Sequence, residues 1–252
     1  MKKLIIIFLL FSNIIFASDF EINFGLSSGY SVIFNEVKQA GNVGLGYQYG
    51  MRIGDGTTIN ALISTGRNYK IPNEKLTSIS ALFETGYNFY IRYRNYDLNN
   101  KDRTEEYMYH SIILGVLAKF NFYNNISFGV GGGIFFPLYS KTNIKDISLG
   151  VYQNTTKFPY HKIVYMHKVP IMPYIKFNVE RYFYFTKKWA FTIGLNLIYN
   201  FGMEFNMDRL KNENKAKDEY QGYSGTYYGY EKYKFSSLAA ELVFSISFGR
   251  PK

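Results

Sequence analysis

The chain has 252 residues, no cysteine and a formal net charge of +10. The lack of cysteine excludes a disulfide framework and a cysteine-based metal site within this sequence. Aromatic residues form 19% of the chain, with 25 tyrosines and 23 phenylalanines, a content that is high for a soluble domain.

The first 17 residues have the pattern of a cleavable secretory signal. Met1–Lys3 supply a basic start, an apolar run follows from Leu4 to Leu10, and Ala17 is a small residue suited to cleavage. We therefore expect a signal peptide at 1–17 and one domain at 18–252, with a retained membrane anchor as the alternative. No later stretch is long and apolar enough for a membrane helix, so an exported chain is expected to be soluble or to span as a closed β-barrel.

Apolar and polar residues alternate from residue 20 to the end of the chain. The clearest example is the last segment, where Leu238, Leu242 and Phe244 alternate with smaller or polar residues such as Glu241. A period of two indicates strands with one apolar face. The predicted strands lie at about 20–34, 42–53, 59–63, 75–84, 87–96, 110–122, 126–138, 170–185, 189–205 and 233–249.

The strand count depends on whether residues 78–95 form one strand or two. One strand gives nine in total, but bacterial single-chain barrels have an even number, with short turns on the periplasmic side. A turn at Thr85-Gly86 gives about ten strands, with eight as the alternative. Tight turns at 54–57, 85–86, 124–125 and 186–188, and both termini, are then periplasmic, and longer connections at 35–41, 67–75, 97–105, 139–168 and 206–232 lie outside.

The secretion signal, the repeated alternating hairpins and the closing strand Leu242–Phe248 resemble the small outer-membrane β-barrel proteins of the OmpA, OmpX and opacity-protein group. The resemblance is one of architecture and covers the chain after the signal. It implies an all-β fold, a transmembrane antiparallel up-and-down β-barrel, as a monomer surrounded by outer-membrane lipid. The basic charge is then expected to meet anionic headgroups or surface polysaccharide rather than nucleic acid.

Charged residues fall on the inward face of the predicted strands, opposite the apolar rows. They are Glu21, Arg52, Glu84, Arg92, Lys119, Lys176, Glu180 and Glu241. Because charges in a barrel interior need partners, we expect a network of ion pairs that fills the lumen. The alternative is the charged lining of a narrow pore for ions or small solutes. The small strand number favours a filled lumen, since open channels are typical of much larger barrels.

The outer connections carry the residues best suited to recognition. Tyrosine alternates with glycine and serine near the end of the chain, at Tyr220, Tyr223, Tyr227, Tyr228 and Tyr230, as it does in antibody binding loops. We predict a recognition or adhesion loop there, with an outer aromatic girdle as the alternative. The connection 139–168 is basic and suited to an anionic glycan, a host surface ligand or lipid headgroups.

Neither a metal site nor a cofactor site is expected from the histidines. His161 and His167 lack standard zinc spacing and are expected at the surface. A hydrolase at the outer rim would need His110 to meet Asp97 or Asp102, yet these residues form no catalytic motif. The sequence therefore predicts a structural or surface-interaction protein rather than an enzyme.

Overall fold

The computed structural model describes residues 20–39, 54–98, 101–146, 152–209 and 230–249. These residues form a single antiparallel sheet, one short helix and a helical turn at 207–209. The strands are β1 (Phe20–Gln39), β2 (Gly54–Lys70), β3 (Leu76–Leu98), β4 (Lys101–Phe122), β5 (Ile126–Asp146), β6 (Tyr152–Pro159), β7 (Met172–Tyr184), β8 (Trp189–Asn200) and β9 (Tyr230–Phe248), and the helix is α2 (Tyr160–Met166). No helix in these ranges has the length and apolar character needed to cross a bilayer.

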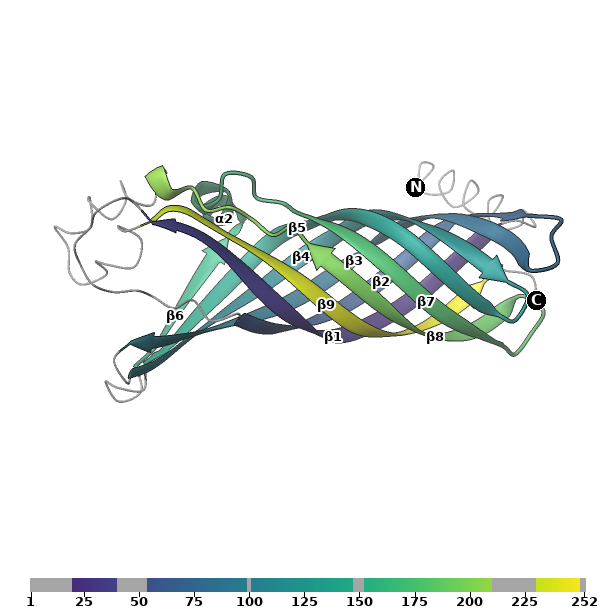
Figure 1. The fold of residues 1–252 in the computed structure, drawn as a ribbon, viewed down its shortest axis with the longest axis horizontal. Coiled ribbons are helices and arrows are strands. Elements are labelled where there is room, and N and C mark those ends of the chain that lie inside the picture. The colour runs from purple at the N-terminus through teal and green to yellow at the C-terminus, as the bar shows by residue number, and fades with distance from the viewer. Residues whose placement is uncertain (1–19, 40–53, 99–100, 147–151, 210–229, 250–252) are drawn as a thin grey trace, which may run out of the picture.

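The sheet closes into a barrel. Eight of the described strands form a ring in the order β1-β2-β3-β4-β5-β7-β8-β9, which is closed by pairing of β9 with β1 (Figure 1). β6 stays outside the ring and pairs with β5 alone among the described strands. The all-β, up-and-down barrel expected from the sequence is confirmed, and eight, the alternative count, replaces ten. The strand predicted at 42–53 lies outside the described residues.

The turn predicted at 85–86 is wrong, because both residues lie inside β3. Gly86 pairs with Leu62 on one side and with Ile113 on the other, so the ladder runs through it without interruption. A Cβ atom at Gly86 would lie 2.1 Å from the carbonyl oxygen of Ala61. The glycine therefore permits a close approach of neighbouring strands instead of reversing the chain.

The turn predicted at 54–57 is wrong for the same reason. Gly56 lies in β2 and pairs with Ser31 of β1 and Arg92 of β3. A Cβ atom there would lie 2.3 Å from the carbonyl oxygen of Ile91. In this barrel, the glycines that were interpreted as turn signals mark close backbone contacts within the wall instead.

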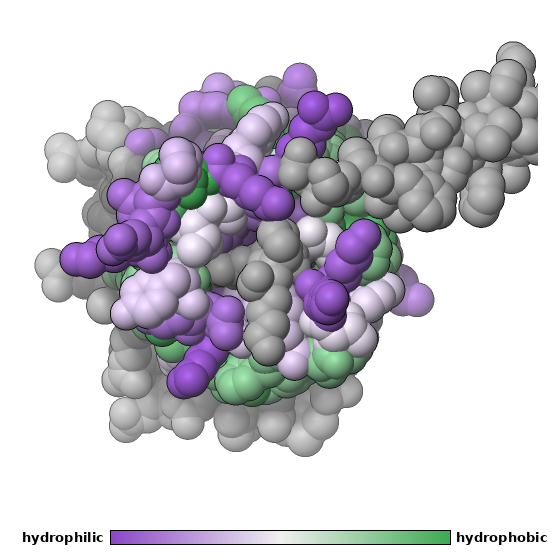
Figure 2. Space-filling model, turned by 90° about the vertical axis from the view of Figure 1, so that its right-hand side faces the viewer, coloured by the Kyte–Doolittle hydropathy of each residue, from purple (hydrophilic) through white to green (hydrophobic). Residues whose placement is uncertain are grey.

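The short connections gather at one end of the barrel. Residues 71–75, 123–125 and 185–188 connect strands at the end where β1 begins and β9 ends, which we call the turn end (Figure 1). The turns predicted at 124–125 and 186–188 are confirmed, whereas 67–75, predicted as an external connection, contains the third short turn. Figure 2 views this end, with hydrophilic residues at the rim and hydrophobic residues on the flanks. The opposite end is the loop end.

The outer wall carries a belt of exposed apolar side chains. On β9, Leu238, Leu242 and Phe244 are exposed while Glu241 and Val243 between them are buried, which confirms the alternation in the sequence. Exposed apolar residues span about nine positions on this strand, the length that a tilted strand needs to cross a bilayer. The wall therefore has the height and polarity of a membrane-spanning barrel.

Strands continue beyond the ring at the loop end, where β1 and β9 pair as far as Gln39 and Tyr230 and β3–β6 extend as two further hairpins. β3 and β4 pair as far as Leu98 and Lys101, and β5 and β6 pair as far as Asp146 and Tyr152. Among the described residues, the last part of β3, beyond Tyr93, pairs with β4. We call β3–β6 in this region the outer sheet (Figure 1). Residues 97–105 and 139–168, predicted as loops, therefore contain much of its strand structure and α2.

Candidate functional site: the barrel interior and its mouth

The interior has a polar zone toward the turn end and an apolar zone toward the loop end. Six of the eight charged residues expected inside lie buried in the polar zone: Glu21, Glu84, Lys119, Lys176, Glu180 and Glu241. Arg92 lies in the apolar zone, and Arg52 lies outside the described residues. The two zones differ in how they hold charge and exclude water.

The first ion pair joins β7 to β3 across the lumen. The Lys176 ammonium nitrogen lies 2.6 Å from both carboxylate oxygens of Glu84. The Ser64 hydroxyl donates a further hydrogen bond of 3.4 Å to the same carboxylate. Neither charge has appreciable contact with solvent, so each depends on the other to offset the loss of hydration.

The second cluster is centred on Lys119. Its ammonium nitrogen lies 2.7 Å from Glu180 and 3.9 Å from Glu21, so two carboxylates are within reach. The same nitrogen lies 3.0 Å from the Tyr182 hydroxyl, which donates to Glu180 over 3.1 Å. The Ser80 hydroxyl donates to Glu21 over 2.5 Å. This cluster links four strands through one cation.

Glu241 is stabilised by neutral donors. Its carboxylate accepts hydrogen bonds from the Ser27 hydroxyl at 2.8 Å and from the side-chain amides of Asn60 at 2.8 Å and Asn196 at 3.3 Å. Asn60 is in turn bonded by Asn88, which extends the chain of polar contacts toward the loop end. Hydrogen bonds to a carboxylate favour its charged form, so these amides take the place of hydrating water.

Side chains fill most of the polar zone. A cavity of about 30 Å³ remains between the two ion pairs, with Glu84, Lys119, Lys176 and Glu180 in its lining. That volume holds about two water molecules. The described residues therefore leave no open aqueous channel, as expected for a ring of eight strands.

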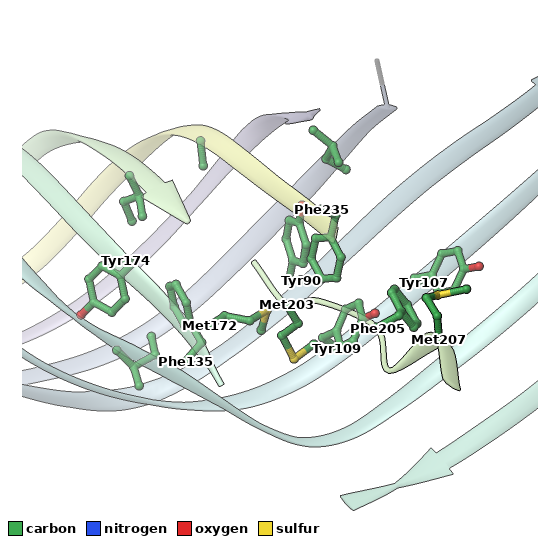
Figure 3. Close-up of a cluster of buried hydrophobic side chains, with 14 residues drawn as sticks. Tyr90, Tyr107, Tyr109, Phe135, Met172, Tyr174, Met203, Phe205, Met207 and Phe235 are labelled. Carbon is green, nitrogen blue, oxygen red and sulfur yellow. The ribbon is translucent and has the colours of Figure 1, made fainter. Parts of the chain in front are cut away.

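A segment of the chain closes the mouth at the loop end. Residues 201–209, which we call the plug, leave β8 and fold inward, and they place Met203, Phe205 and Met207 in the buried apolar zone (Figure 3). The strand predicted at 189–205 therefore ends early, at Asn200. Its side-chain oxygen accepts a 2.7 Å hydrogen bond from the Gly202 amide, and Gly202 has a φ of 64°, which ends the extended strand.

The wall facing the plug is aromatic. The Arg92 guanidinium lies 4.5 Å from the ring centroid of Tyr107 and 4.3 Å from that of Phe235. Tyr109 stacks on Phe235 at 6.0 Å, and Figure 3 shows these rings around the plug side chains. Arg92, predicted in the charge network of the lumen, is buried inside the barrel and lies against ring faces, which attract a guanidinium.

His167 lies beneath the plug, although the sequence predicted a surface histidine. Its ring packs 4.4 Å from Phe205, and its Nδ1 atom lies 2.9 Å from the Ile163 carbonyl oxygen. Burial lowers the pKa of His167 to about 4, and the nearby Arg92 charge acts in the same direction. The imidazole is therefore neutral at pH 7.

His110 contacts aromatic residues on the outer wall. Its ring packs beside Phe89 and Tyr139 at 4.9 and 5.4 Å, and Tyr87 hydrogen-bonds its Nδ1 atom. Asp102 lies eight positions away along β4, about 26 Å at 3.3 Å per residue. The described backbone therefore does not bring a rim histidine and aspartate together. Among the residues that the structure describes, no three histidine, aspartate or glutamate side chains gather as a metal site.

Several expected elements lie outside the described residues. These are the signal at 1–17 and the tyrosines Tyr220, Tyr223, Tyr227 and Tyr228. Tyr230 opens β9, but its side chain is not described. The recognition loop therefore stays a prediction from sequence.

Comparisons with known proteins find similarity in structure alone. No protein-family model matches the chain, and no curated protein matches its sequence. The similar solved structures include the outer membrane protein OprG from Pseudomonas aeruginosa, with 9% identity over 91% of this chain and 96% of that one and a TM-score of 0.42. Ail, the attachment invasion locus protein of Yersinia pestis, crystallised with the heparin analogue sucrose octasulfate, has 10% identity over 90% of this chain and 99% of that one, with a TM-score of 0.34.

The outer membrane protease OmpT from Escherichia coli is also similar, with 7% identity over 91% of this chain and 96% of that one and a TM-score of 0.38. All three are small barrels, the group that the sequence resembles in architecture. At such low scores the similarity carries no statement about activity, so function has to follow from the barrel's own residues.

Proposed function

We propose that this protein is a monomeric, non-enzymatic outer-membrane barrel that presents the outer sheet and its neighbouring loops as a binding surface for anionic glycans. The observation that carries the proposal is the continuation of β3–β6 well past the apolar belt. Strands that only needed to cross the membrane would end about where the belt ends.

The membrane assignment rests on the wall. A closed ring satisfies the backbone hydrogen bonds of every wall strand, and the exposed apolar belt suits contact with hydrocarbon. Short turns at one end and long extensions at the other match periplasmic and external ends, so we place the outer sheet outside the cell. The filled lumen supports an anchoring role rather than a permanently open pore.

The ligand class follows from the charge of the outer sheet. Lys141 on β5 and Lys157 on β6 are direct cross-strand partners, and like charges placed opposite one another destabilise a sheet. On its other side Lys141 pairs directly with the uncharged Met108, and Glu106, two positions further along β4, accepts a 2.7 Å hydrogen bond from Asn143. Exposed Lys162 on α2 adds a third positive charge. A bound sulfate, carboxylate or phosphate would offset this repulsion.

Binding to a sulfated polysaccharide surface tests the proposal. The double variant Lys141→Ser/Lys157→Ser should bind about tenfold more weakly at low salt, since an exposed lysine contributes roughly 0.5–1 kcal/mol to such contacts. The matched control, Lys187→Ser/Lys188→Ser, removes two exposed lysines from the turn end and should bind like wild type. Equal losses in both variants would show a non-specific effect of net charge and refute a site on the outer sheet.

A further inference from the structure

The plug is attached to the mouth but is not part of the wall. Along its backbone it forms two isolated bridges, His167 with Phe205 and Glu204 with Lys234. The Phe201 amide also donates to the Pro173 carbonyl over 2.9 Å, and the Phe235 amide donates to the Met203 carbonyl over 3.4 Å. By contrast, β8 pairs with β9 along its entire length. Withdrawal of the plug would therefore break few backbone hydrogen bonds and leave the ring closed.

The ties of the plug lie at its rim. The amide of Lys168 donates to the carbonyl of Glu204 over 2.9 Å, and the amide of Asn206 donates to that of Met166 over 2.8 Å. The side chains of Lys168 and Glu204 form a 2.5 Å ion pair that is open to solvent. Exposed pairs contribute little, so the rim holds the plug weakly compared with the wall.

The base of the plug is a fixed bend. Gly202 has a left-handed φ of 64°, and a Cβ atom there would lie 1.5 Å from the carbonyl oxygen of Phe235. Only glycine allows the chain to turn inward this close to β9. The bend separates the wall strand from the plug, and it is the natural hinge for a movement of residues 203–209.

The plug supplies the apolar barrier to water at the mouth, in series with the side chains that fill the polar zone below it. Met203, Phe205 and Met207 place apolar side chains across the mouth, and apolar constrictions close a pore by excluding water. Below them the lumen is polar and holds a small cavity. Lys119 has two carboxylates within 4 Å, so its ammonium group can exchange one for the other without being left unpaired.

The charge below the plug has a definite sign. In the described part of the lumen, carboxylates outnumber ammonium groups: Glu21, Glu84, Glu180 and Glu241 face Lys119 and Lys176. The balance of these six groups is −2, and buried Arg92 beside the plug reduces it to −1, which still favours cations over anions. We propose that the plug is a gate and that the barrel passes small cations when the plug is withdrawn. This activity is separate from glycan binding on the outer sheet.

A reversible cross-link tests the gate. The chain has no cysteine, and Glu204 and Lys234 are antiparallel bridge partners, whose Cα separation of about 4.5–5.5 Å suits a disulfide. The full-length Glu204→Cys/Lys234→Cys protein is reconstituted in planar bilayers under a KCl gradient, oxidised and then reduced. As a control, Asn143→Cys/Thr155→Cys, another pair of direct cross-strand partners, cross-links the outer sheet without touching the plug or the lysines proposed for glycan binding.

We expect oxidation to suppress channel openings about tenfold or more in the plug-locked protein, and reduction to restore them. The outer-sheet control should not respond to oxidation. Phe205→Ser, which weakens the apolar barrier, should raise the frequency of openings, and the reversal potential should show preference for K⁺ over Cl⁻.

Equal currents before and after oxidation of the locked protein would overturn the gate. So would an absence of openings in Phe205→Ser that still migrates as a folded, heat-modifiable barrel. Preference for Cl⁻ would overturn the assignment of cations. Binding to polysaccharide is read out separately, so either proposal can fail without the other.

Discussion

Removal of one partner from the buried Lys176–Glu84 pair should destabilise the barrel strongly. Lys176→Met replaces the charged lysine with an uncharged side chain of similar length. The Glu84 carboxylate then remains in the lumen. Within the described residues, the Ser64 hydroxyl, 3.4 Å away, still donates a hydrogen bond to it. The perturbation therefore creates a buried charge that lacks its counter-ion.

The size of the effect follows from the burial of both groups. Each side chain is less than 5% exposed, so solvent cannot replace the lost partner. Loss of one member of such a pair costs about 3–5 kcal/mol of the free energy of unfolding. The double variant Lys176→Met/Glu84→Gln removes both charges and should recover most of this loss, to within about 1–2 kcal/mol of wild type.

Urea unfolding in lipid vesicles measures these differences. The chain has a single tryptophan, and the Trp189 ring lies 4.8 Å from that of Phe248, so its fluorescence reports the seam between β8 and β9. Lys168→Met is the matched control, because its ion pair is 52% and 26% exposed and should contribute less than about 1 kcal/mol. Equal losses in Lys176→Met and Lys168→Met, or a double variant no better than the single one, would refute the reasoning.

Three further perturbations probe the wall and the mouth. Leu242→Arg puts a charge in the apolar belt and should cost about 2–4 kcal/mol in vesicle unfolding, so an unchanged midpoint would argue against lipid contact there. Gly86→Val pushes a side chain toward the Ala61 carbonyl and should cost about 1–3 kcal/mol, whereas a residue in the periplasmic turn predicted at 85–86 would tolerate it. The pKa of His167 is about 4 in the folded protein and 6.5 in the unfolded chain. The contribution of the neutral imidazole to the stability of the folded state is therefore complete above pH 6.5 and falls as the pH drops toward 4. The stability of wild type relative to His167→Gln should therefore decrease by on the order of 3 kcal/mol between pH 7 and pH 4, and a difference that does not vary with pH would contradict the buried, neutral imidazole.

The wall could be predicted because strand alternation is a local property. Leu242 and Glu241 point to opposite faces whatever the rest of the chain does, so the lipid-facing row and the inward charges follow from a period of two. The partner of each inward charge does not follow. Glu84 and Lys176 lie 92 residues apart, and the tilt and stagger of the closed ring bring them together.

The strand count and the plug show where local patterns fail. Gly86 is of a residue type common in turns, but here it permits two strands to approach closely. The sequence alone does not distinguish a glycine in a turn from a glycine at a close contact. Met203, Phe205 and Met207 continue the alternation of β8 after the chain has left the wall. Periodicity indicates an apolar face without indicating what covers it. The burial of His167 could not be predicted from the sequence either, because the plug that covers it is distant along the chain.

Labelling of single cysteines in intact cells tests most directly whether the barrel spans the outer membrane with the outer sheet facing out. The chain has no native cysteine, so Lys157→Cys on the outer sheet, Val116→Cys in the belt and Lys187→Cys at the turn end can be compared cleanly with a membrane-impermeant maleimide. We predict rapid labelling at 157, labelling at 187 only after the outer membrane is permeabilised, and protection at 116 in both conditions. Labelling at 187 with protection at 157, or equal labelling at all three positions, would contradict the proposed orientation and the membrane-spanning wall.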